Sequence, residues 1–156
     1  MSTDYEKIEY IQKTITQLLE VGGFKPRVEY EQSLNKGLVF RISVDSPKLL
    51  IGRQGSTLSA IEHLIFAIVN RHYKDSESHT QFTIDIDDYR ANREWQLKQQ
   101  VKDAVTKLKY SQEPIVLPPM PRHERKFVHT YIQQQFPHLT TESYGEEPSR
   151  SIKMHI

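Results

Sequence analysis

The sequence predicts an α+β protein built from two small modules with a long helix between them. Apolar residues recur at helical intervals in four segments and alternate with polar residues in several shorter ones. A proline-rich stretch over 112–121 sets the last of these segments apart from the rest of the chain. With 156 residues, of which 37% are hydrophobic, the chain is long enough to bury two small cores.

The first module is expected to begin with an amphipathic helix and to continue with two strands. Isoleucine and leucine recur three and four residues apart over 8–19, and the glycine pair at 22–23 ends this pattern. A short strand is expected over 27–31 and a hairpin turn over 33–37. Residues 38–44 then alternate between apolar and polar side chains, which predicts a strand with one buried face.

The rest of the first module is expected to contain a short helix, a glycine turn, a helix and a strand. A single helical turn over 47–50 leads into Gly52-Arg53-Gln54-Gly55. Apolar residues at helical spacing predict a helix from 58 to about 73, and a polar loop follows over 74–79. Alternation over 82–86 predicts another strand.

A second long helix is expected over 88–110. Its apolar face consists of residues at helical spacing: Leu97, Val101, Ala104, Val105 and Leu108. Asp87 or Asp88 is expected to cap its first turn. Trp95 is expected to pack rather than to offer a stacking surface, because it lies inside a helix. Arg90 and Arg93 are expected to lie on a solvated or interdomain face.

The last part of the chain is expected to form the second module. Four prolines over 112–121 predict a stiff linker. A helix over 122–135 and two short strands, over 139–144 and 151–155, are expected to follow. The expected organisation is therefore a first module, a connecting helix with its linker, and a second module, covering 1–87, 88–120 and 121–156.

The glycine turn has the chemistry of a phosphate clamp. Gly52 and Gly55 lack a Cβ, so a nucleic-acid backbone could approach them closely. The amide groups that open the next helix favour an anion, and Arg53 adds a positive charge. An ordinary helix-entry turn is the structural alternative, and the surrounding order of elements favours the clamp.

This order of elements with a G-x-x-G turn resembles the prokaryotic, type II K-homology (KH) domain. Such a domain grips about four nucleotides of a single strand, with the backbone on the turn and the bases in an apolar groove. The resemblance implies that Ile51, Leu58 and the region of Ile42 line the groove. The implied RNA-binding residues of this module are Lys48, Ile51, Gly52, Arg53, Gln54 and Gly55.

A second motif lies in the last module. Arg125 and His129 are four residues apart and therefore share one helix face, with Arg122 one turn earlier. The spaced tail that follows contains Ser143, Gly145, Pro148 and Arg150. Together these residues resemble the small nucleic-acid-binding domain named for its invariant arginine and histidine. The alternative is a structural pair in which His129 holds a backbone carbonyl.

The resemblance implies nucleic-acid contacts for Arg125, His129 and Arg150, with Arg122 and Lys126 adding positive charge. A KH domain followed by an Arg-x-x-x-His domain resembles the bacterial SpoIIIJ-associated (Jag) RNA-binding family, here without the family's N-terminal Jag domain. The resemblance implies single-stranded RNA as the partner, with single-stranded DNA as an alternative. It also implies a role as an RNA chaperone or post-transcriptional regulator.

Composition limits the other function classes. The net charge is only +1, so any nucleic-acid surface must be a local patch. The chain has no cysteine, which excludes disulfides and thiolate metal sites. The polar start does not resemble a signal peptide, and the longest apolar run, over 64–69, is too short to span a bilayer. We therefore expect a cytoplasmic protein that does not insert into membranes.

Two rival functions remain open. One is a protein-interaction scaffold, through a KH-mediated homodimer or a heterodimer with a small single-KH protein. The other is a metal-dependent nuclease that uses Asp85, Asp87 and Asp88. Strand alternation and helix capping account for these aspartates more simply. We therefore expect no catalytic residue, no metal and no cofactor, and a binding protein rather than an enzyme.

Overall fold

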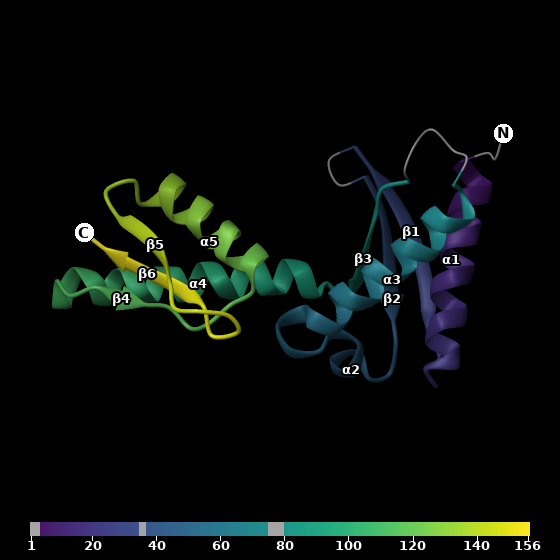
Figure 1. The fold of residues 1–156 in the computed structure, drawn as a ribbon, viewed down its shortest axis with the longest axis horizontal. Coiled ribbons are helices and arrows are strands. Elements are labelled where there is room, and N and C mark those ends of the chain that lie inside the picture. The colour runs from purple at the N-terminus through teal and green to yellow at the C-terminus, as the bar shows by residue number, and fades with distance from the viewer. Residues whose placement is uncertain (1–3, 35–36, 75–79) are drawn as a thin grey trace. The chain divides into compact units, whose positions relative to one another are not determined.

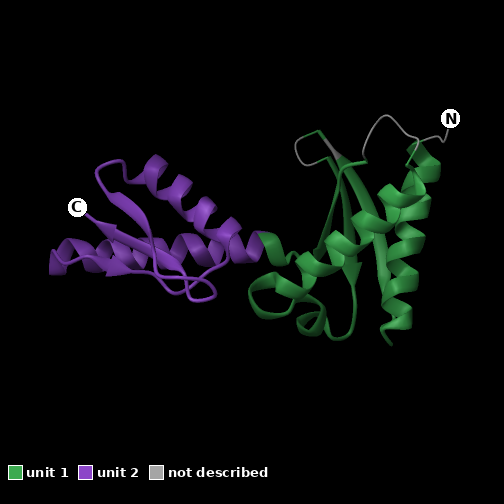
Figure 2. Cartoon of the chain, viewed as in Figure 1, with its two compact units in different colours: residues 1–90 green, residues 91–156 purple. Residues whose placement is uncertain are grey.

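The computed structural model describes residues 4–34, 37–74 and 80–156. The chain forms two compact units, residues 1–90 (unit 1) and 91–156 (unit 2), which Figure 2 shows in green and purple. The expected hairpin turn includes residues 35–36 and the expected polar loop includes residues 75–79, which lie outside the described residues.

Unit 1 is a three-stranded sheet with helices packed against it (Figure 1). Its elements are α1 (Asp4–Val21), β1 (Arg27–Ser33), β2 (Gly37–Ser43), α2 (Pro47–Ile51), the 3₁₀ turn η1 (Arg53–Gly55), α3 (Ser56–His72) and β3 (Phe82–Ile86). Strand β2 lies in the centre, antiparallel to β1 and parallel to β3. This is the element order that the sequence periodicities predict.

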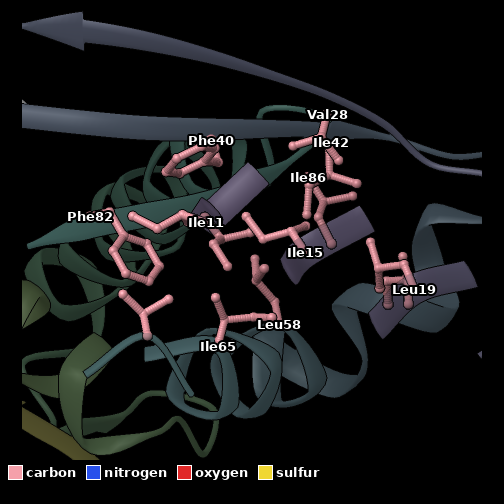
Figure 3. Close-up of a cluster of buried hydrophobic side chains, with 13 residues drawn as sticks. Ile11, Ile15, Leu19, Val28, Phe40, Ile42, Leu58, Ile65, Phe82 and Ile86 are labelled. Carbon is pink, nitrogen blue, oxygen red and sulfur yellow. The ribbon is translucent and has the colours of Figure 1, made fainter. Parts of the chain in front are cut away.

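The core of unit 1 joins the two long helices to the sheet (Figure 3). Helix α1 contributes Ile11 and Ile15, both fully buried, because they lie one turn apart on its apolar face. Alternation along the strands places Phe40, Ile42 and Ile84 in the same core. Each such side chain stabilises the fold by about 1.5–3 kcal/mol relative to an exposed position.

Unit 2 has its own sheet and its own core. Its elements are α4 (Tyr89–Ser111), whose first two residues belong to unit 1, β4 (Ile115–Val116), α5 (Arg122–Gln135), β5 (Thr140–Tyr144) and β6 (Ser151–His155). Strand β6 lies in the centre, antiparallel to both neighbours. The core contains Leu97, Val101, Ala104, Val105, Leu108, Leu117, Met120, Val128, Ile132, Leu139, Ile152 and Met154.

The segment 88–120 therefore does more than connect. The apolar face of α4 packs against α5 and β6, because one helix cannot bury that face alone. The proline-rich stretch contains β4, in which Ile115 pairs with Met154, and it continues with a hydrogen bond from Leu117 N–H to Ile152 O at 2.8 Å. Among the described residues, no helix is both long and apolar enough to cross a membrane.

Candidate nucleic-acid interface

The glycine turn of unit 1 has an unusual backbone conformation. Gly52 follows α2 with φ 71°, Gln54 has φ 53° and Gly55 has φ 77°. Residues other than glycine seldom adopt such values, so two of the three positions suit the residue that occupies them. The Gly52 N–H donates to Lys48 O at 3.0 Å and closes the short helix α2.

The chain itself fills the space that the two glycines leave. A Cβ on Gly52 would overlap the Thr57 side chain, and a Cβ on Gly55 would lie 2.8 Å from Tyr89 Cε1. The sequence argument assigned this space to an approaching nucleic acid. In the structure, the close approach is made by Thr57 and Tyr89, so the fold alone requires both glycines.

The other candidates around the turn differ in accessibility. Lys48 and Arg53 are exposed, whereas Ile51 and Gln54 are half-buried. Two residues expected to line an apolar groove, Leu58 and Ile42, are each only 1% exposed and belong to the core. The exposed apolar side chain beside the turn is Leu49, at 68% exposure.

Two charged side chains close the edge of the sheet near the turn. The Ile84 N–H on the edge strand β3 donates to Glu62 Oε2 at 2.7 Å, and Arg90 Nε donates to Ile84 O at 3.1 Å. Arg90 Nη2 also donates to both Glu62 carboxylate oxygens, at 3.0 and 3.1 Å. The pair thus covers main-chain groups that an edge strand would leave open. Sequence reasoning missed Glu62.

The aspartates after β3 have structural partners. Asp85 Oδ1 accepts hydrogen bonds from the Ile86 N–H at 3.0 Å and the Arg90 N–H at 3.4 Å. The expected cap of α4 by Asp87 or Asp88 is therefore replaced by Asp85, because the other two have φ of 48° and 54° and turn the chain. Burial raises the pKa of the Asp85 carboxyl, and the two amide hydrogen bonds oppose this shift.

Asp88 forms an ion pair with Arg41, which also contacts Glu31 at 3.1 Å. Within the described parts of the chain, no group of three or more histidine, aspartate or glutamate side chains could hold a metal ion.

The second motif lines an open cleft of ≈560 Å³ in unit 2. Helix α5 and the segment from β5 to β6 contribute its walls, so residues distant in sequence meet there. The lining residues are Arg122, Arg125, Lys126, His129, Thr130, Ser143, Glu147 and Arg150. All five site residues that the sequence predicts for this module are among them.

Arg125 is a buried part of this wall, with only 6% exposure. Its Nη1 donates to Met120 O at 2.8 Å and its Nη2 donates to Glu147 Oε1 at 2.5 Å. The Met120 N–H in turn donates to Arg150 O at 3.1 Å. Arg125 therefore ties the segment before α5 to the loop that carries Glu147 and Arg150. Its guanidinium builds the cleft as well as lining it.

His129 is half-buried and hydrogen-bonded through Nδ1 to Thr141 Oγ1 at 2.7 Å. Burial, and secondly the positive charge of Arg125, lower the pKa of His129 below its ordinary value. The imidazole is therefore mainly neutral near pH 7. The exposed positive charges of the cleft are those of Arg122, Lys126 and Arg150.

Sequence reasoning also missed partners on the other side of α5. Arg93 donates to both oxygens of Glu124, at 2.7 and 2.9 Å, and Glu124 is only 3% exposed. Arg93 therefore supports unit 2 instead of lying on a solvated face. The expectation that Trp95 packs is wrong, because this side chain is 63% exposed. Its position in the helix did not reveal which face meets the core.

Comparison with known proteins places these features in a family. Residues 96–154 match the family of the Arg-x-x-x-His (R-3-H) domain, and the match begins within α4, earlier than the boundary expected at 121. Three relatives are each named RNA-binding protein KhpB. The relative from Clostridium symbiosum is 30% identical over 125 residues, which make up 80% of this chain and 54% of that protein.

The relative from Lactiplantibacillus plantarum is 33% identical over 108 residues, 69% of this chain and 32% of that protein. The relative from Bacillus subtilis is 32% identical over 154 residues, 94% of this chain and 71% of that protein. The chain thus spans about half or less of the first two relatives and most of the third. The extent of the third match shows that this chain belongs to the KhpB family.

Proposed function

We propose that this chain is an RNA-binding protein that holds single-stranded RNA in the cleft of unit 2 and at the glycine turn of unit 1. The observation that carries this proposal is the cleft itself, where Arg122, Lys126 and Arg150 present exposed positive charge. The cleft lies in the region that matches the Arg-x-x-x-His domain family, and the relatives are named as RNA-binding proteins.

The chemistry of the cleft suits a phosphodiester backbone. Arginine and lysine bind phosphate oxygens through charge-assisted hydrogen bonds, and each neutralised phosphate releases a counterion. The net charge of the whole chain is only +1, so the attraction has to be local. The neutral His129 would offer a ring nitrogen or a stacking surface instead of a full charge at pH 7.

Unit 1 is proposed to act as a type II KH module. Its support is the order of elements, the parallel pairing of β2 with β3, and the left-handed turn before α3. Lys48 and Arg53 are exposed beside this turn and would contact phosphate, while Leu49 offers apolar contact to a base. Two modules on one chain bind a long strand more tightly than either alone.

The biological role proposed is that of a non-enzymatic RNA chaperone or post-transcriptional regulator. A KH-mediated dimer, of two copies or with a small single-KH protein, is compatible with this role and would add further binding modules.

The test is fluorescence anisotropy with labelled single-stranded RNA and DNA across a salt series. One variant, Lys126→Ala with Arg150→Ala, removes charge from the cleft. Its matched control, Lys107→Ala with Lys109→Ala, removes the same charge from exposed positions on α4 outside the cleft. A third variant, Arg53→Asp with Gln54→Asp, tests the glycine turn. Circular dichroism confirms that each variant is folded.

We expect the cleft variant to weaken RNA binding and to reduce the slope of log K against log salt by about 2, since each phosphate contact contributes about 1. The control should stay close to wild type. If wild type binds no RNA at low salt, or if the cleft variant and its control behave alike, the RNA-binding proposal is overturned and a protein-interaction role takes its place.

A further inference from the structure

The cleft of unit 2 contains one negative charge among its positive ones. Of the described residues that line it, Arg122, Arg125, Lys126 and Arg150 are cationic, and Glu147 is the acidic one. The Glu147 carboxylate accepts a hydrogen bond from Arg125 Nη2 at 2.5 Å. An acid in this position opposes a polyanionic ligand, so its presence calls for a physical reason.

The two partners of this ion pair are buried to very different degrees. The Arg125 side chain is 7% exposed, and its Nη1 is already held by Met120 O. The Glu147 side chain is 58% exposed. A buried guanidinium without an anion is strongly destabilising, whereas an exposed carboxylate returns to water at little cost. The pair is therefore asymmetric: Arg125 needs an anion, and Glu147 can leave.

A phosphate oxygen satisfies the same N–H as a carboxylate oxygen does. Arginine binds both groups through similar charge-assisted hydrogen bonds. The flanking cations, Arg122, Lys126 and Arg150, would hold the rest of a phosphodiester in the cleft. A strand that enters the cleft can thus replace the carboxylate without leaving Arg125 unpaired at the end of the exchange.

We propose that Glu147 occupies a phosphate position on Arg125 in the free protein and is displaced from it when single-stranded RNA binds. This inference rests on the proposed function and names the group that RNA replaces in the cleft. Glu147 keeps the buried arginine paired in the absence of RNA and lowers the affinity of the cleft for weak anions. Only a ligand that also engages the flanking cations competes effectively.

Substitution of Glu147 by glutamine tests the exchange. Glutamine keeps the size and one acceptor oxygen, so the loop retains a partner for Arg125, but the competing charge is gone. The matched control is Glu146→Gln, which removes the same charge from the exposed neighbouring residue that does not line the cleft. The probe is a fluorescein-labelled single-stranded oligouridylate, measured by anisotropy at low and moderate salt.

We expect Glu147→Gln to bind the oligouridylate roughly fivefold more tightly than wild type, the factor that corresponds to an exposed ion pair. Glu146→Gln should stay within about twofold of wild type, because an exposed charge is largely screened. Equal affinities for the two variants, or weaker binding by Glu147→Gln, would overturn the exchange.

A measurement on the wild-type protein makes the test independent of how the variant folds. The side-chain carboxyl ¹³C resonance of Glu147 should move on saturation with oligouridylate toward the position of an exposed, unpaired glutamate. A resonance that stays at its free-protein position in the complex sinks the proposal. Should wild type bind while Lys126→Ala with Arg150→Ala weakens binding, a negative result here would reject the exchange and leave RNA binding intact.

Discussion

Tyr89 packs directly on Gly55: a Cβ placed on this glycine would lie 2.8 Å from Tyr89 Cε1 and 3.3 Å from its hydroxyl oxygen. Gly55 ends the glycine turn and Tyr89 begins helix α4, so the turn and the start of that helix form one packed unit. The adjacent residue, Arg90, holds Glu62 and the edge of β3. The conformation of the turn is thus maintained by contacts on the side of α4.

Gly55→Ala should destabilise the protein more than Gly23→Ala. Both glycines have a left-handed φ, of 77° and 86°, which costs alanine about 1–2 kcal/mol. Nothing lies within 4 Å of a Cβ on Gly23, whereas Gly55 would also meet Tyr89. Overpacking of this kind adds about 1–3 kcal/mol. Urea unfolding measures both variants, and equal losses would show that Tyr89 moves aside freely.

Glu124→Ala should cost about 3 kcal/mol of unfolding free energy, at the lower end for a broken buried pair, because Arg93 keeps 19% exposure. The matched control is Glu142→Ala in the same unit, whose pair with Lys153 spans 3.9 Å between exposed side chains and contributes less than about 1 kcal/mol. Thermal unfolding monitored by circular dichroism compares them. Similar losses in the two variants would refute the structural weight placed on Arg93 and Glu124.

Arg125→Lys and Lys126→Ala should separate stability from binding. Lysine at 125 cannot donate to Met120 O and Glu147 in the same planar arrangement, so we expect a loss of about 1–3 kcal/mol in stability. Lys126 is exposed, and its removal should change stability by less than about 0.5 kcal/mol while lowering the salt slope of RNA binding by about 1. Chemical unfolding and anisotropy give both quantities, and the reverse pattern would contradict the role assigned to Arg125.

His129 should make stability fall in mildly acidic solution. Its folded pKa is lowered, by burial first and by Arg125 second, so the unfolded chain binds the proton more readily. The stabilisation is fully present above the unfolded pKa of about 6.5 and is lost as the pH falls through that value toward the folded pKa. Wild type should therefore lose unfolding free energy between about pH 7.5 and 5.5.

His129→Gln should reduce this pH dependence, since glutamine does not titrate. His138→Gln, at an exposed position in the same unit, should retain the wild-type profile. Urea unfolding at a series of pH values compares the three proteins. A profile of His129→Gln that matches wild type would contradict the assignment to His129.

Much of the candidate site could be predicted because its motifs are local. Arg125 and His129 share a helix face by their spacing alone, and the structure places both on the wall of one cleft with Arg150. Glu147 could not be predicted, because it occupies a position in the tail with no residue preference of its own. Glu62 lies 28 residues from its partner Arg90, and no sequence pattern links the two.

The sequence by itself determined where the helices and strands form, because periods of 3.6 and 2 residues arise from interactions between near neighbours in the chain. It also determined the turn at Gly52 and Gly55, since few residues accept a left-handed backbone. Only the tertiary structure decided that the proline-rich stretch pairs with β6, that Trp95 is exposed, and that Arg125 is buried against Met120 and Glu147. These outcomes depend on which distant surfaces meet, and the topology of the whole chain sets that through packing.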